Sequence, residues 1–207
     1  MKRFELSLHP IKRNRTKAFC IKMKKKQKVV SLMLSENEKY NHFVNDFSEA
    51  LYNLKMEVPF SDYIFLCVGS DKIIGDTYGP LVGEKLKGAF TNMYHNIYVY
   101  GTLEEPISAM NLEKTVQEIY RKFSTPCIIA VDSALGSDHR IGNIFVSNSK
   151  MQCGKGTGKK MLYVGDISIK GVVGKDYKIP KYNFSGLQSI PLGSVMKLAD
   201  ITATRNL

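Results

Sequence analysis

The sequence predicts an α/β fold built on a mostly parallel sheet. Two apolar runs, at 63–68 and 127–131, are rich in β-branched and aromatic residues and are too short for helices, so they fit buried strands. Segments with apolar residues three and four positions apart alternate with such runs along the chain. This alternation favours parallel strands joined by right-handed helical crossovers.

The first part of the chain follows this alternation closely. Ser35 is a suitable N-cap for a helix that begins at Glu36. Pro80 suits the first turn of the next helix, and Pro126 ends the crossover before the second apolar run. In the crossover helix the side chains expected to face inward are Leu112, Val116, Ile119 and Tyr120. The predicted order is a helix from 36, strand 63–68, a helix from 80, strand 97–100, helix 111–123 and strand 127–131.

The last third of the chain is less regular. A glycine- and lysine-rich segment, 152–160, lacks the glycine spacing and the final Ser or Thr of a phosphate-binding loop, so we interpret it as a basic hairpin or lid. The elements expected around it are strands at 144–146 and 161–164, with 167–169 as an extension of the second, and a helix at about 189–204.

Charge divides the chain into two parts. The 207 residues suffice for one domain with a hydrophobic core, and the formal net charge is +11. Residues 1–30 hold eleven Lys and Arg against one acidic residue, so the rest is close to neutral. We predict a basic, disordered extension over 1–35 and a single α/β domain over 36–207. The extension is a solvated tail, a segment that binds nucleic acid or anionic lipid, or a segment outside the mature chain.

Composition gives the expected compartment and cofactors. We find neither a secretory signal nor a membrane-length apolar run, so a soluble, cytoplasmic protein is expected. The four cysteines form no CxxC pair, and the four histidines lack metal-ligand spacing. No cofactor and no metal are therefore expected. The oligomeric state is left open.

An aspartate follows each of the two apolar runs, and this pair carries the functional prediction. Asp76 lies in a glycine-rich string after the first run, and Asp132 directly follows the second. Because the carboxyl ends of parallel strands border a crevice, we expect the two carboxyls to face each other, within about 4–7 Å or bridged by a water. Such a pair shares one proton and activates water as base and acid. Alternatively, Asp76 caps a helix and Asp132 stabilises a turn. Asp71 and Asp166 are weaker candidates.

Three strings carry a resemblance to a known family. They are GSDKIIGDTYGPLVG at 69–83, YGTLEEPISAMNL at 100–112 and GDISIKG at 165–171. With these strings, residues 62–204 resemble the YyaC-type sporulation proteins. That group is similar to the germination protease of spore-forming bacteria and, more distantly, to hydrogenase maturation proteases. The resemblance implies a phosphorylase/hydrolase-like, three-layer α/β/α sandwich and an atypical aspartic endopeptidase.

The resemblance also implies a site. Asp76 and Asp132 correspond to the two motif aspartates of the germination protease, although Gly75 replaces a proline there and Thr77 and Tyr78 replace Ala and Leu. The nickel-binding His of the hydrogenase enzymes has no counterpart after His139.

The predicted function is therefore a sporulation-linked peptidase, acting on a protein or peptide in the forespore or spore interior. Small acid-soluble spore proteins are the substrate that the resemblance implies. The alternatives are a non-catalytic factor that binds a partner in the same cleft and a nucleic-acid-associated protein that acts through the basic extension.

Overall fold

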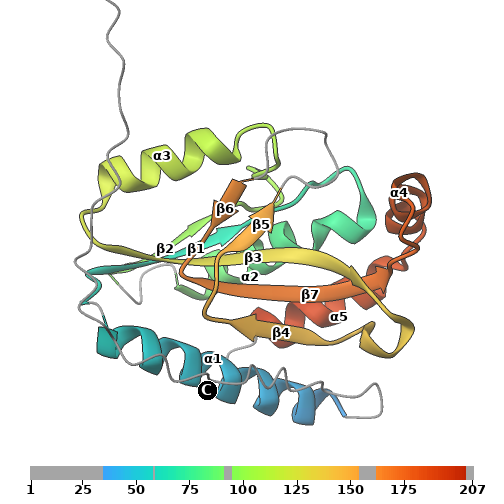
Figure 1. Ribbon diagram of the computed structural model, residues 1–207, viewed down its shortest axis with the longest axis horizontal. Helices are drawn as coiled ribbons and strands as arrows, with labels where there is room; N and C mark the ends of the chain where they lie inside the picture. Colours follow the sequence, from blue (N-terminus) through green and yellow to red (C-terminus); the bar gives the residue numbers. More distant parts are fainter. Residues whose placement is uncertain (1–34, 58, 91–94, 154–161, 204–207) are drawn as a thin grey trace, which may run out of the picture.

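A five-stranded sheet forms the centre of the part of the chain that the computed structural model describes, residues 35–57, 59–90, 95–153 and 162–203. Its strand order is β2-β1-β3-β7-β4, so strands that are neighbours in the sheet are not always consecutive in the chain (Figure 1). The first three strands in this order and β7 run parallel, and β4 pairs with β7 antiparallel. The strands are β1 (Asp62–Cys67), β2 (Ile97–Tyr100), β3 (Pro126–Gly136), β4 (Ile144–Ser147) and β7 (Ile167–Lys175).

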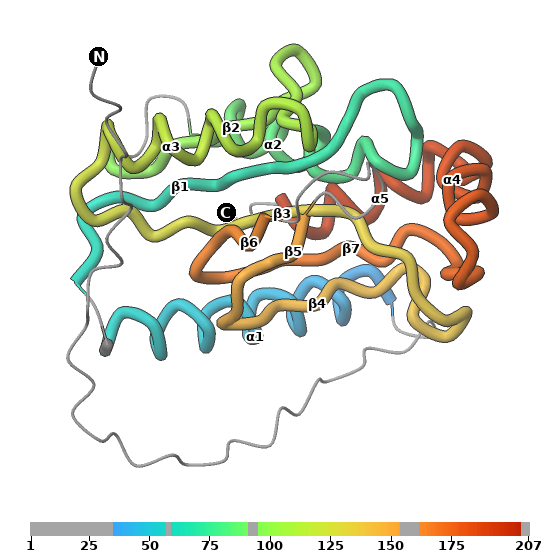
Figure 2. Tube along the Cα trace, turned by 45° about the horizontal axis from the view of Figure 1, so that its top comes forward, coloured from blue at the N-terminus to red at the C-terminus, as the bar shows by residue number. Residues whose placement is uncertain are grey.

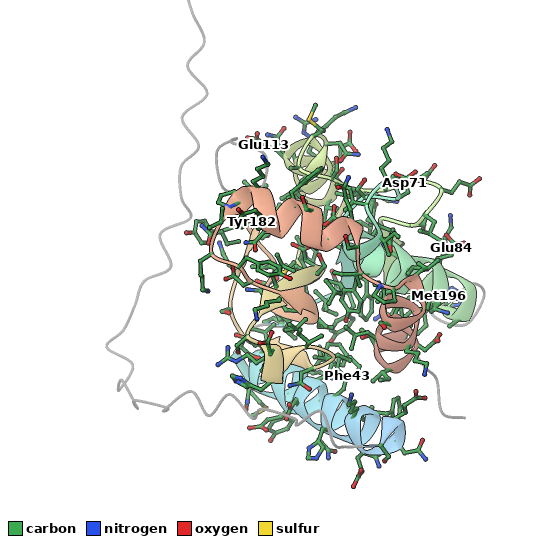
Figure 3. The ribbon with its side chains drawn as sticks, turned by 90° about the vertical axis from the view of Figure 1, so that its right-hand side faces the viewer. Phe43, Asp71, Glu84, Glu113, Tyr182 and Met196 are labelled. Atoms are coloured by element: carbon green, nitrogen blue, oxygen red, sulfur yellow. The ribbon has the colours of Figure 1, made fainter. Side chains whose placement is uncertain are left out.

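Helices cover both faces of this sheet and produce three layers (Figure 2). One face packs against three helices in a core that includes Phe43, Tyr78 and Val195, and Figure 3 shows Phe43 directed toward the sheet. The opposite face packs against α3 and a small hairpin of β5 and β6. The helices and the hairpin strands are α1 (Glu36–Glu57), α2 (Tyr78–Phe90), α3 (Leu112–Lys122), α4 (Pro180–Gln188), α5 (Leu192–Ala203), β5 (Met151–Cys153) and β6 (Leu162–Val164).

The predicted fold class and most elements are confirmed. The cap of α1 forms as expected, because the Ser35 amide donates to Glu38 at 2.8 Å and the Glu38 amide donates back to the Ser35 hydroxyl at 3.3 Å. The strand expected at 97–100 and the helices expected at 111–123 and 189–204 are present within three residues of their predicted bounds.

Other expectations need correction. α2 begins at Tyr78 rather than at Pro80, after the short 3₁₀ helix η1 (Ile74–Thr77). Tyr120, expected to face inward, is 57% exposed. β7 is a long strand of the main sheet rather than an extension of β6, because Gly165, with φ at 88°, turns the chain between them. β5 and α4 were not expected at all.

Some predictions concern residues that the structure does not describe. Residues 1–34 are among these, so the N-terminal extension stays a prediction. Residues 154–161, within the predicted basic hairpin or lid, are also among them, while the strands on either side pair antiparallel. Among the described helices, none is long and apolar enough to cross a membrane.

Candidate active site

The loop after β1 folds back tightly on itself and carries Asp76. Its first glycine, Gly69, has φ at 152°, and a Cβ there would lie 2.1 Å from the carbonyl oxygen of Asp76. The Ser70 amide donates to that same carbonyl at 3.1 Å. The glycine-rich string thus lets the chain return to the end of β1, and η1 then holds Asp76 beside the sheet.

Asp132 lies within β3, which corrects the expectation that it follows the strand. β3 continues to Gly136 because it pairs with β7 beyond the apolar run. Side chains alternate along a strand, so Asp132 lies on the same face as Ile128 and Ala130, the face covered by α3 and the hairpin. Both Asp132 and Asp76 are partly buried.

The charges of the two aspartates act on each other. Burial raises the pKa of the Asp132 carboxyl well above its usual range, and the negative charge of Asp76 raises it further. Burial also raises the pKa of Asp76, although less strongly. Two carboxyls in this state cannot both ionise at low cost, so a proton remains on the pair to a higher pH than on either group alone.

Ser133 distinguishes the two carboxyls. Its hydroxyl donates to Oδ1 of Asp76 over a long 3.4 Å and lowers the pKa of that group. Its backbone amide donates to Asp132, but burial and the Asp76 charge outweigh this contact. Asp132 is therefore the more strongly protonated member, and Asp76 is the one that ionises first.

The structure argues against a capping role for Asp76. Among the described residues, the hydrogen bond that its carboxylate accepts comes from Ser133 on β3, not from the backbone of α2. The first turn of α2 is instead fixed by Tyr78, which is fully buried and shares a 2.7 Å hydrogen bond with the Thr202 hydroxyl on α5. The Tyr78 ring lies over Gly171 of β7, where a Cβ would come within 2.5 Å of it.

Two further side chains interact electrostatically with Asp132. Lys170 is its partner in the β3–β7 register, and its positive charge lowers the pKa of Asp132. Cys153 on β5 is the second, and its burial raises the thiol pKa to about 12, with the Asp132 charge adding to this effect. A thiol with this pKa stays protonated at neutral pH and is a poor nucleophile.

The weaker candidates have structural roles or surface positions. Asp166 turns the chain between β6 and β7, where its carboxylate accepts from the Ile128 amide at 2.9 Å and its own amide donates to the Ile128 carbonyl at 2.7 Å. Asp71 is exposed in a turn of the loop after β1, at the side of the molecule that Figure 3 faces.

A surface pocket lies away from the two aspartates, and the described residues offer no metal-binding cluster beside them. Among the described residues, no group of three or more His, Cys, Asp or Glu side chains is arranged to hold a metal ion. A surface pocket of about 370 Å³ lies at the β2 edge and is lined by residues such as Thr102, Glu105 and Asn111, without Asp76 or Asp132. Asn111 has a structural role there, because its side chain bonds the Ser108 amide at 2.8 Å and the Pro106 carbonyl at 3.1 Å.

Comparison with known proteins identifies the family. Residues 32–205 match the family described as "Protein of unknown function (DUF1256)". The chain belongs to this family. It is also 34% identical over 146 residues to "Uncharacterized protein YyaC" of Bacillus subtilis (strain 168), a match that covers 68% of this chain and 65% of that protein, slightly under two thirds of its length. The predicted resemblance to YyaC-type proteins is thereby confirmed.

A solved structure is also similar. The NiFe hydrogenase maturation protease HycI from Thermococcus kodakarensis KOD1 matches with a TM-score of 0.44 and 16% identity, over 70% of this chain and 92% of that one. The link to the germination protease is not tested by these comparisons and stays a prediction, as does the catalytic role of Asp76 and Asp132.

Sequence reasoning missed Ser133 and Lys170. Ser133 directly follows a predicted site residue, so its position alone offered a signal. Lys170 was a charged residue between apolar ones in the string Ile167 to Val173, which is unusual in a buried strand. Its partner could not be read from the sequence, since register depends on how distant strands pair.

Proposed function

We propose that this chain is a peptidase that uses Asp76 and Asp132 to activate a water molecule. The observation that carries the proposal is that two partly buried carboxyls, one on η1 and one within β3 just past the end of β1, act on each other electrostatically. In this proposal Asp76, which ionises first, is the general base. Asp132, which keeps its proton to higher pH, is the general acid.

The reaction then follows in two steps. Asp76 takes a proton from the water as the water oxygen bonds to the scissile carbonyl carbon, and Asp132 gives its proton to the carbonyl oxygen. In the second step the C–N bond breaks, the amine receives the proton from Asp76, and Asp132 recovers its proton from a hydroxyl of the tetrahedral intermediate. Both carboxyls return to their starting states, and one amide has been hydrolysed to an acid and an amine.

The proposed substrate is a polypeptide. Support for this class comes only from the resemblance to the germination protease, which places small acid-soluble spore proteins first among the substrates to test. A sporulation role within the cell is proposed on the same ground. The proposed peptidase function does not require the basic N-terminal extension to contact nucleic acid.

The deciding experiment compares three variants in which one aspartate is replaced by asparagine. Asp76→Asn and Asp132→Asn each remove one member of the pair, and Asp71→Asn makes the same change at an exposed position of the loop that holds Asp76. We expect the wild type and Asp71→Asn to cleave peptides from a spore-protein library. The two site variants should lose at least about 1000-fold in rate, because each removes a proton-transfer group.

Other outcomes count against the proposal. Equal cleavage by all four proteins would mean that the activity lies elsewhere or belongs to a contaminant. If the wild type binds library peptides without cleaving them, the non-catalytic binding factor becomes the better assignment.

A further inference from the structure

Lys170 lies in the middle of a strand that is otherwise almost wholly buried. From Ile167 to Gly174, every residue of β7 except Lys170 is buried. The β3–β7 register pairs Lys170 with Asp132. Neighbouring strands lie about 4.8 Å apart, and paired residues of parallel strands direct their side chains to the same face. The lysine therefore shares the hairpin-covered face with the proposed general acid.

Among the described residues, the charge of Lys170 lowers the pKa of Asp132 and of Cys153. Phe145 of β4 is its register neighbour on the other side and carries no charge. Cys153 of β5 interacts electrostatically with both Lys170 and Asp132, and its thiol is neutral at physiological pH. Among the described residues, Lys170 makes no ion pair within 4.0 Å, so its charge acts on Asp132 through space.

In the proposed reaction a negative charge forms on Asp132, and the position of Lys170 bears on its stability. At rest the negative charge is on Asp76, and it moves to Asp132 when Asp132 gives its proton to the substrate. Burial and the low local polarity make that new charge costly. A cation on the neighbouring strand, paired in register with Asp132, lowers this cost at the moment when the charge forms.

We propose that Lys170 is a positioning residue whose ammonium group stabilises the ionised form of Asp132 during proton transfer to the substrate. This inference rests on the proposed function for its catalytic part. Its electrostatic part, that Lys170 sets the ionisation of Asp132, can be tested without any substrate.

The experiment uses four variants of the full chain. Lys170→Met removes the charge and keeps most of the side chain, and Lys170→Gln replaces it if the first variant does not fold. Lys170→Arg keeps the charge. Lys175→Met is the matched control on the same strand, because Lys175 is exposed and bonds Asp138 at 2.9 Å, outside the site.

Two readouts separate the parts of the inference. Titration of the Asp132 side-chain carboxyl by ¹³C NMR should move to higher pH by about one unit in Lys170→Met or Lys170→Gln, and stay unchanged in Lys170→Arg and Lys175→Met. In peptide cleavage, the neutral variants should lose about tenfold or more in kcat with little change in KM, and their pH profile should shift upward.

The results distinguish failure of this inference from failure of the proposed function. An unchanged Asp132 titration in the neutral variants overturns the inference whatever the activity. A shifted titration with unchanged kcat overturns the catalytic part. If the wild type cleaves nothing, the proposed function fails, while the titration still decides whether Lys170 controls the charge of Asp132.

Discussion

Asp132 occupies a position that is unfavourable for a negative charge, and this affects folding as well as chemistry. Its pKa in the folded protein is raised by burial and by Asp76, so the folded state holds its proton more tightly than the unfolded chain. The stability linked to this proton is complete below the unfolded pKa, near pH 4, and is lost as pH rises through the folded pKa. Protein with Asp132 ionised therefore unfolds more easily.

Replacing Asp132 with Asn removes this loss. We expect Asp132→Asn to be more stable than the wild type at neutral pH by about 1 kcal/mol, with the difference vanishing near pH 4. Urea unfolding of both proteins between pH 4 and 8 measures it. A variant that is less stable throughout would mean that the carboxylate has a structural role within β3, since its position inside the strand already contradicts the turn role.

The residue scale also shows what the sequence can reveal of a site. The sequence predicts Asp76 and Asp132 as a pair because strand ends border crevices, which is a local rule. Their coupling depends on a packing arrangement between η1 and β3 that no local pattern encodes. Lys170 became a candidate only with the register, which joins residues 38 positions apart in the chain.

At the scale of elements, glycines decide how closely α2 approaches the sheet. A Cβ on Gly79 would lie 2.0 Å from the carbonyl oxygen of Val68, at the end of β1. Gly79→Ala should therefore cost about 3 kcal/mol or more, because backbone on both sides would have to move. Gly88 lies in the same helix with nothing within 4 Å of such a Cβ, and Gly88→Ala should stabilise the protein by about 0.5–1 kcal/mol.

Denaturant unfolding of the two alanine variants checks this pair of predictions. Equal effects would show that general helix propensity, and not the close approach of α2 to β1, decides the outcome.

The bounds of an element could be predicted where the hydropathy pattern changes at its ends. Where the pattern does not change there, the bounds could not be predicted. β2 and α3 end at clear changes of pattern, so their bounds were close. β3 continues through Asp132 and Ser133, because the ladder to β7 satisfies the backbone whatever the side chains are. α4 contains no buried residue and so leaves no apolar stripe in the sequence.

For the whole molecule, the two cores that the described residues form lie between Phe43 and Ala199. The capping contacts of α1 begin at Ser35. We therefore expect a chain truncated before Ser35 to fold, with a melting temperature within about 5 °C of the full chain. Circular dichroism and thermal melts measure this. Loss of cooperative melting would show that the first 34 residues take part in the fold.

The two aspartates lie on elements that differ in rigidity: Asp76 on the short 3₁₀ helix η1 and Asp132 on the long strand β3. β3 pairs with β1 as far as Val131 and with β7 from Ile129 to Gly136, so the backbone at Asp132 moves only when this part of the sheet opens. Asp76 is on a four-residue 3₁₀ turn, which rearranges far more readily. The distance between the two carboxyls therefore changes mainly through movement of η1, which carries Asp76. A ligand that immobilised η1 would fix the geometry of the pair and leave the sheet unchanged.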